Sequence, residues 1–294
     1  MGRVKLERKY AVWGWLFVAP ASLMIFILSF FPMIQAFILS LQSGRGNNLR
    51  FAGMRNYLRL LEDEQFRAAV CNVFTYLIIQ VPIMLILALI LATILNEQTL
   101  KLKGLFRTLV FLPCVAGLVS AATIFKSIFS IDGLVNIMLL KLHIITSPVS
   151  FLSDPVWAKA VIIIVITWRW TGYNTIFYLA GFQTIETSIY EAARIDGANA
   201  AQQFFKITMP LLRPVILLTT IMSTNGTLQI FDEVRTITGT SGGPGNATLT
   251  ISQYIYNLSF LYSPQFGYAA AASYTILFMV AVLSFIQMKI GDKE

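Results

Sequence analysis

The chain has 294 residues, of which 56% are apolar and only 12% are charged, and its formal net charge is +8. Soluble domains carry about 25% charged residues, so this composition excludes an ordinary soluble protein and indicates an all-α integral membrane protein. The basic residues flank apolar segments, where they orient helices in a bilayer, and they do not alternate with aromatic residues as a nucleic-acid surface would require. We therefore expect the lipid bilayer as a partner and no nucleic acid.

Six segments have the roughly 20 apolar residues that a membrane-spanning helix needs. They are predicted at Trp13–Leu41, Cys71–Leu95, Leu105–Phe129, Val156–Phe182, Ile207–Phe231 and Gly267–Met288. The first apolar run exceeds the roughly 7–15 residues of a cleavable signal peptide, so we expect an uncleaved span. Six spans place both termini on one side, and the basic residues before the first span favour the cytoplasm.

These segments predict one transmembrane domain at residues 13–288, with cytoplasmic tails at residues 1–12 and 289–294. The loops are too short to house a domain that hydrolyses nucleotide or captures solute. Other chains would therefore supply the energy for any solute movement. Five arginines between the first two spans oppose the predicted orientation: Arg45, Arg50, Arg55, Arg59 and Arg67.

The sequence offers little material for catalysis or metal binding. Cys71 and Cys114 lie in apolar surroundings without a CxxC pattern, and the only histidine, His143, lies in a short loop. We therefore expect no catalytic residue, no metal and no cofactor. The glycine-rich stretch at residues 239–245 lacks the Gly-Lys-Ser/Thr ending of a phosphate loop. We expect it to be an external loop that touches a solute-binding protein, or else a plain connector.

Two predicted spans carry polar residues at membrane depth. Ser223 and Thr227 are four residues apart, so they share one face of the fifth span. Sugar hydroxyls need hydroxyl, amide and guanidinium partners, with aromatic rings against the apolar faces of the sugar. These features predict a substrate path that contains Arg169, Tyr173, Asn174, Ser223, Thr227 and Gln229. Ordinary polar packing between helices is the alternative interpretation.

Arg169 is considered separately because an arginine in the middle of a span is costly and marks a functional site by default. Its guanidinium would suit the carboxylate of a uronic or sialic acid, or a pair of hydroxyls. Alternatively, it stacks on Trp168 or Trp170. In that case it pairs with Asp232 or Glu233. The sequence leaves both interpretations open.

A polar stretch, Glu191–Pro214, separates the fourth and fifth spans and must lie at a membrane face. Glu191, Ala192 and Ala193 favour a helix, and Gly197 is suited to end one. A linker would not need paired alanines or the later Phe204 and Phe205. We therefore predict a docking surface for a second protein.

This stretch resembles the EAA loop of the permeases of binding-protein-dependent ABC importers. The family pattern E-A-A-x-x-D-G-A, followed by I-x-x-P-x-x-x-P, is met at Glu191, Ala192, Ala193, Asp196, Gly197, Ala198, Ile207, Pro210 and Pro214. From about Trp168 to the end, the order of motifs is similar to the maltose-type first permease of sugar importers. One departure is the spacing from Thr238 to Gly242, which is longer than the usual T-x-G-G-P.

The resemblance implies a type I ABC importer permease fold with six transmembrane helices, in the plasma (inner) membrane of a prokaryote. It implies a cytoplasmic coupling loop at residues 186–206, in which Glu191, Ala192, Ala193, Asp196 and Gly197 contact an ATPase. It also implies a sugar site that includes Tyr173, Ser223 and Thr227. The expected partners are a second homologous permease, two ATP-binding subunits, an extracellular or periplasmic sugar-binding protein and a saccharide.

ATP hydrolysis would then belong to a separate subunit, and this chain would not be an enzyme. The alternative function is a stand-alone secondary transporter of a polar solute. The sequence disfavours it because no paired carboxylates lie within the spans and no inverted repeat is visible.

Overall fold

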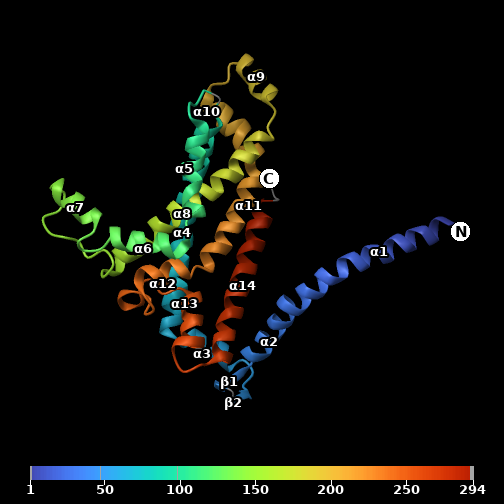
Figure 1. The fold of residues 1–294 in the computed structure, drawn as a ribbon, viewed down its shortest axis with the longest axis vertical. Helices are drawn as coiled ribbons and strands as arrows, with labels where there is room; N and C mark the ends of the chain where they lie inside the picture. Colours follow the sequence, from blue (N-terminus) through green and yellow to red (C-terminus); the bar gives the residue numbers. More distant parts are fainter. Residues whose placement is uncertain (1, 47, 98, 292–294) are drawn as a thin grey trace. The chain divides into compact units, whose positions relative to one another are not determined.

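The computed structural model describes residues 2–46, 48–97 and 99–291, which are mostly helical (Figure 1). The elements are α1 (Gly2–Ile25), η1 (Phe26–Phe30), α2 (Phe31–Ser40), β1 (Gln42–Arg45), β2 (Asn48–Phe51), α3 (Arg55–Glu62), α4 (Glu64–Asn96), α5 (Lys103–Val115), α6 (Leu118–Ile128), α7 (Leu134–Lys141), α8 (Pro155–Gln183), α9 (Thr187–Ile195), α10 (Ala200–Gln203), η2 (Phe204–Thr208), α11 (Met209–Leu228), α12 (Asp232–Thr238), η3 (Pro244–Asn246), α13 (Ile251–Tyr256), η4 (Asn257–Leu261) and α14 (Phe266–Gly291). The chain divides into two compact units. Unit 1 contains the described residues up to Leu60 together with Leu258–Tyr274, and unit 2 contains Leu61–Asn257 together with the described residues from Thr275 onward.

Five runs of helix are long and apolar enough to cross a membrane, and each overlaps one predicted span. They are Trp13–Ser40, Glu64–Asn96, Pro155–Gln183, Ala200–Leu228 and Phe266–Gly291. Helix extends beyond the spans at both ends of the chain, because α1 begins at Gly2 and α14 ends at Gly291. Residue 1 and residues 292–294 of the predicted tails lie outside the described residues.

The remaining predicted span, Leu105–Phe129, is not one continuous helix. It consists of α5 and α6, which meet at an angle of 96°. Pro113 removes one backbone donor from the last turn of α5, and Ala116 and Gly117 then adopt extended ψ values of 136° and 130°. The run of apolar residues predicted the length of this segment correctly, but it contains no information about the bend.

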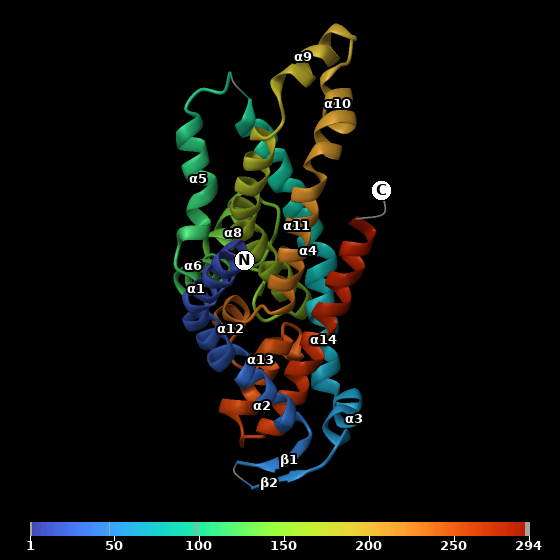
Figure 2. The same ribbon diagram turned by 90° about the vertical axis from the view of Figure 1, so that its right-hand side faces the viewer.

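Unit 2 is built around α4, α8 and α11, which run side by side (Figures 1 and 2) and contact one another. Asp154 caps the start of α8 by accepting the backbone N–H groups of Val156 and Trp157 at 2.8 and 3.0 Å. Gly172 lets α8 approach α5 closely, since a Cβ at this position would collide with the backbone carbonyl of Val110. Small residues at such contacts are typical of helix packing in membranes.

In unit 1, Asn56 links the start of the short hairpin β1–β2 to the end of α2. The buried Asn56 side chain donates to the carbonyl oxygens of Ser40 and Gln42 at 2.8 and 2.7 Å. The first span, Trp13–Ser40, has none of its most apolar 18-residue window buried within the chain. A helix that is apolar on all sides requires lipid or another protein around it.

Candidate functional site

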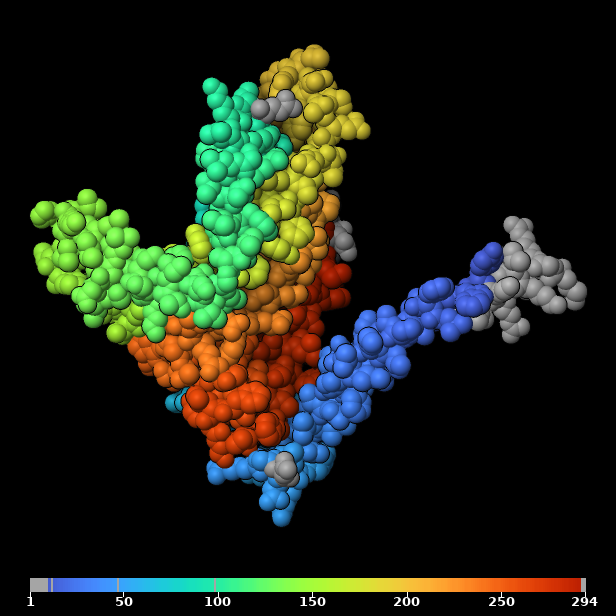
Figure 3. Space-filling model, viewed as in Figure 1, coloured from blue at the N-terminus to red at the C-terminus, as the bar shows by residue number. Residues whose placement is uncertain are grey.

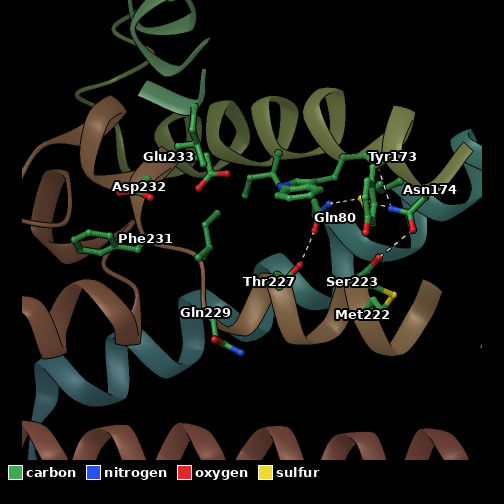
Figure 4. A pocket seen from close by; sticks show the side chains of 16 residues that line it. Gln80, Tyr173, Asn174, Met222, Ser223, Thr227, Gln229, Phe231, Asp232 and Glu233 are labelled. Atoms are coloured by element: carbon green, nitrogen blue, oxygen red, sulfur yellow. Dashed lines mark hydrogen bonds between the residues drawn. The ribbon is translucent and has the colours of Figure 1, made fainter. Parts of the chain in front are cut away.

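A cavity of about 410 Å³ lies in unit 2 among α4, α8, α11 and the start of α12 (Figure 4). It is lined by Gln80, Met84, Leu118, Ile166, Trp170, Tyr173, Asn174, Met222, Ser223, Gly226, Thr227, Gln229, Ile230, Phe231, Asp232 and Glu233. Five of the six predicted substrate-path residues are in this set: Tyr173, Asn174, Ser223, Thr227 and Gln229. The sixth, Arg169, lies outside the set of described residues that line the cavity. The volume is at the lower end of the roughly 300–1,000 Å³ of small-molecule sites.

The polar residues of α11 are presented to the cavity by helical spacing. Thr227 donates from its hydroxyl to Oε1 of Gln80, across to α4, at 3.0 Å. One turn earlier, the Ser223 hydroxyl donates to Oδ1 of Asn174 on α8, at 3.4 Å. Figure 4 shows these two bonds bridging the walls of the cavity, whereas the amide of Gln229 points away from them. The hydroxyls and amides that would recognise a sugar therefore bond to one another here.

Aromatic rings supply the apolar part of the cavity wall. Trp170 and Tyr173 project from neighbouring turns of α8, with ring centroids 5.7 Å apart and planes at 89°. Phe231 follows the end of α11 and lines the opposite end of the cavity. Aromatic surfaces beside hydroxyl and amide groups suit a ligand with apolar C–H faces and many hydroxyls.

Two carboxyl groups lie at the α12 end of the cavity. After α11 ends at Leu228, the chain turns at Phe231 and begins α12 with Asp232 and Glu233. Glu233 is only 5% exposed. Burial raises the pKa of its carboxyl, although the charge of Arg169 and a hydrogen bond from Trp170 act in the opposite direction.

The predicted coupling segment forms a separate exposed site at the end of unit 2, where α9 appears at the top of Figures 1 and 3. Glu191 and Ala192 are exposed on α9, and Ala193 is half-buried. Gly197 has a φ of +82°, which favours glycine. The N–H of Gly197 donates to the Arg194 carbonyl at 3.1 Å, and that of Ala198 donates to the Ala193 carbonyl at 2.9 Å. These two bonds form a Schellman motif, so the helix ends where the sequence predicted.

The segment after α9 is also firmly folded. Asn199 and Gln202 exchange side-chain and backbone hydrogen bonds in a capping box that starts α10. The hydroxyl groups of Tyr190 and Thr208 lie 2.8 Å apart and tie α9 to the base of α11. Phe205 is nevertheless 67% exposed. A rigid segment that exposes apolar side chains is suited to binding another protein.

Comparison with known proteins places the chain in a family. Residues 100–290 match the family described as binding-protein-dependent transport system inner membrane component. The chain belongs to this family. The permease is 55% identical over 285 residues to the lactose transport system permease protein LacF of Rhizobium radiobacter, covering 97% of this chain and 96% of that one. It is 34% identical over 292 residues to the trehalose/maltose transport system permease protein MalF of Thermococcus litoralis, covering 98% and 96%.

The fold of the permease also matches a solved transporter. A chain of a bacterial ABC transporter involved in the import of the acidic polysaccharide alginate aligns with a TM-score of 0.85, covering 98% of both chains at 24% identity. A second structure shows a bacterial alginate ABC transporter in complex with an alginate pentasaccharide-bound periplasmic protein, with a TM-score of 0.82 and coverages of 98% and 96% at 24% identity. The type I importer permease fold that the resemblance implied is confirmed.

In the permease, Arg169 bonds to the broken helix. Its Nη1 donates to the carbonyl oxygen of Ala116 at 2.9 Å, and its guanidinium lies 5.6 Å from the ring centroid of Trp170. The break between α5 and α6 frees the Ala116 carbonyl from helical bonding, and Arg169 satisfies it. The side chain is 9% exposed, and its Nε has no hydrogen-bond partner among the described residues. The role of Arg169 in the substrate path stays a prediction.

The sequence analysis missed the contribution of α4 to the cavity. Gln80 and Met84 line it from this helix, and both side chains are buried. The available signal was the amide of Gln80 in the middle of a long apolar run. Asp232 and Glu233 were considered only as partners of Arg169, whereas both carboxylates line the cavity.

The glycine-rich loop of the permease is held by its own contacts. Gln253 donates from Nε2 to the Gly239 carbonyl at 2.7 Å, and the Thr248 N–H donates to the Gly242 carbonyl at 2.9 Å. Gly242 has a φ of +77°, and a Cβ there would lie 2.6 Å from the Cβ of Leu249. The loop is therefore an ordered surface, and its contact with a binding protein stays a prediction.

Proposed function

We propose that this chain forms half of the translocation pore of a sugar importer, and that its cargo is a neutral disaccharide such as lactose. The observation that carries the proposal is the cavity, in which hydroxyls and amides of α4, α8 and α11 converge beside Trp170 and Tyr173. The similarity to LacF of Rhizobium radiobacter, at 55% identity over nearly the whole chain, supports lactose as the first sugar to test.

The charge of the cavity supports a neutral cargo. Its lining includes Asp232 and Glu233 but no arginine or lysine among the described residues. Arg169, the nearby cation, is directed to the Ala116 carbonyl. The carboxylate of a uronic acid would therefore meet the acidic side chains of Asp232 and Glu233 and no lining cation, whereas hydroxyls would find donors and acceptors.

The proposed mechanism is alternating access driven by separate subunits. A second homologous permease completes the pore, two ATP-binding subunits hydrolyse ATP, and an external binding protein delivers the sugar. Both termini and the loop at residues 186–206 face the cytoplasm, so that closure of the ATPase pushes on the helix containing Glu191, Ala192 and Ala193. The hydrogen bonds that end α9 at Asp196 and Gly197 support this role, because a well-formed helix can transmit displacement to α8 and α11.

The test is uptake into proteoliposomes that contain the complete importer, ATP and sugar-loaded binding protein. We expect ATP-dependent accumulation of radiolabelled lactose and no accumulation of a disaccharide that contains galacturonic acid. Vesicles with this chain alone should accumulate neither sugar. Lactose uptake by the chain alone in an ion gradient would contradict the subunit role, and preferred uptake of the uronic-acid disaccharide would contradict the neutral cargo.

A further inference from the structure

Two carboxamide groups in the cavity converge on a single sulfur atom. Nε2 of Gln80 lies 3.1 Å from Sδ of Met84, one helical turn away on α4. Nδ2 of Asn174, on α8, lies 3.6 Å from the same sulfur. All three side chains are almost completely buried, with exposures of 0% for Gln80, 1% for Met84 and 3% for Asn174. Both donors therefore depend on partners within the protein.

A thioether sulfur is a weak hydrogen-bond acceptor, and a buried amide donor without a strong acceptor costs about 1–3 kcal/mol. Asn174 has a second acceptor, because Nδ2 also donates to the Trp170 carbonyl at 3.0 Å. The acceptor of Gln80 Nε2 is the Met84 sulfur, while Oε1 of Gln80 is occupied by the Thr227 hydroxyl. In this state, Gln80 is thus well satisfied as an acceptor and poorly satisfied as a donor.

The poorly satisfied donor faces a space that a ligand can enter. Gln80, Met84 and Asn174 all line the cavity of about 410 Å³, and Figure 4 shows Gln80 between Thr227 and Tyr173. Methionine has three rotatable bonds and adapts easily to new neighbours. A hydroxyl oxygen is a much stronger acceptor than a thioether, so a hydroxylated ligand would displace the sulfur at little cost.

We propose that Gln80 binds the substrate directly. In the sugar-free state its amide donates to the Met84 sulfur, and a hydroxyl oxygen of the sugar replaces this acceptor on binding. This inference rests on the proposed function and adds α4 to the helices that contact the cargo. Exchange of the sulfur for the hydroxyl joins α4 and α8 through the sugar, since the amide of Asn174 gains the same acceptor. The recognised chemistry is a neutral saccharide hydroxyl that accepts one or two amide hydrogen bonds.

The test uses the complete importer in proteoliposomes, with wild type and three variants that keep side-chain volume nearly constant. Gln80→Met removes the amide, and Met84→Leu removes the sulfur. Thr175→Val is the matched control, because Thr175 is buried, lies 3.4 Å from the Ala88 carbonyl of α4 and is outside the cavity lining. We expect Gln80→Met to lower kcat/KM for lactose by about 10- to 100-fold, as for loss of a buried polar contact. Thr175→Val should stay within about threefold of wild type, and Met84→Leu should lower kcat/KM by less than Gln80→Met does, because the sulfur leaves the amide when the sugar binds.

Deoxy analogues of lactose separate recognition from structural support. For the analogue that lacks the hydroxyl bound by Gln80, Gln80→Met should lower transport much less than it does for lactose, as in a double-mutant cycle. If Gln80→Met lowers transport of lactose and of every analogue by the same factor, Gln80 only supports Thr227 and the inference is wrong. Normal lactose uptake by Gln80→Met, or an equally large loss in Met84→Leu, would also overturn it.

The identity of the transported sugar is determined separately, from uptake by the wild-type importer. If the wild-type importer carries maltose or trehalose instead of lactose, the proposed cargo is wrong. Wild type and Gln80→Met are then compared with the sugar that is carried and with its deoxy analogues. The role of Gln80 is therefore tested whichever sugar is the cargo.

Discussion

Substitution of Ala192 by tryptophan is the most direct test of the coupling segment. Ala192 is exposed on α9, in the stretch where small side chains would allow a partner to approach closely. The change leaves the Schellman motif at Gly197 untouched, because that motif is made by backbone groups. Any large effect of Ala192→Trp must therefore come from contact with another protein.

The expected free-energy cost of the tryptophan differs between the isolated permease and its interface with the ATPase. Within the chain, the cost is the difference in helix propensity, which is below about 0.7 kcal/mol, since the exposed side chain meets no packed neighbour. In a close interface, an oversized side chain costs about 1–3 kcal/mol. This corresponds to a loss of roughly 5- to 150-fold in affinity for the ATPase. Thermal stability of the isolated permease should thus stay the same while assembly weakens.

The assay measures co-purification of the ATPase with the permease and ATP-dependent uptake in proteoliposomes. The control is Thr146→Trp, which adds the same bulk at an exposed position between α7 and α8, outside the coupling segment. We expect Ala192→Trp to lose both ATPase binding and uptake, and Thr146→Trp to lose neither. Full ATPase binding and uptake by Ala192→Trp would refute the docking role of α9.

Three further predictions concern unit 2. Arg169→Ala should abolish uptake while the complex still assembles, because it removes the donor to the freed carbonyl beside the cavity; normal uptake would refute its importance. The raised pKa of Glu233 means that folding favours its protonated form, so stability should fall as pH rises from about 4.5 through the raised pKa. Thermal unfolding of wild type and Glu233→Gln between pH 4.5 and 8 should show this slope only in wild type, and equal slopes would refute it. Gly172→Ala should destabilise the permease by about 1–3 kcal/mol through its clash with the Val110 carbonyl, whereas Gly104→Ala, which meets open space, should not; equal melting temperatures would refute the close contact.

The sequence predicted the spans and the coupling helix because both depend on local composition. A run of apolar residues must enter the bilayer whatever its neighbours are. The end of α9 was predictable for a similar reason, since Gly197 adopts a backbone conformation that other residues avoid. Five residues of the cavity were predicted from the polarity of the fourth and fifth spans together with the resemblance to sugar importer permeases.

The remaining features depend on contacts between distant segments. Gln80 is an amide within an apolar stretch of α4, and its sequence context is the same whether it packs against a helix or lines a cavity. The partner of Arg169 was not predictable, because the Ala116 carbonyl becomes available only through the break between α5 and α6. Pro113 and Gly117 were visible, but neither residue alone requires a bend of 96°.

The break would also change how a membrane voltage falls across this part of the protein. α5 has 13 residues, so it extends about 20 Å, whereas the hydrocarbon core is about 30 Å thick. Water that reaches Ala116 from the side of α6 would have only the length of α5 left to cross. The electric field would be concentrated over that shorter distance, with the charge of Arg169 at its edge. The electrical seal of the resting pore would then depend on the packing of α5 against α8 at Gly172.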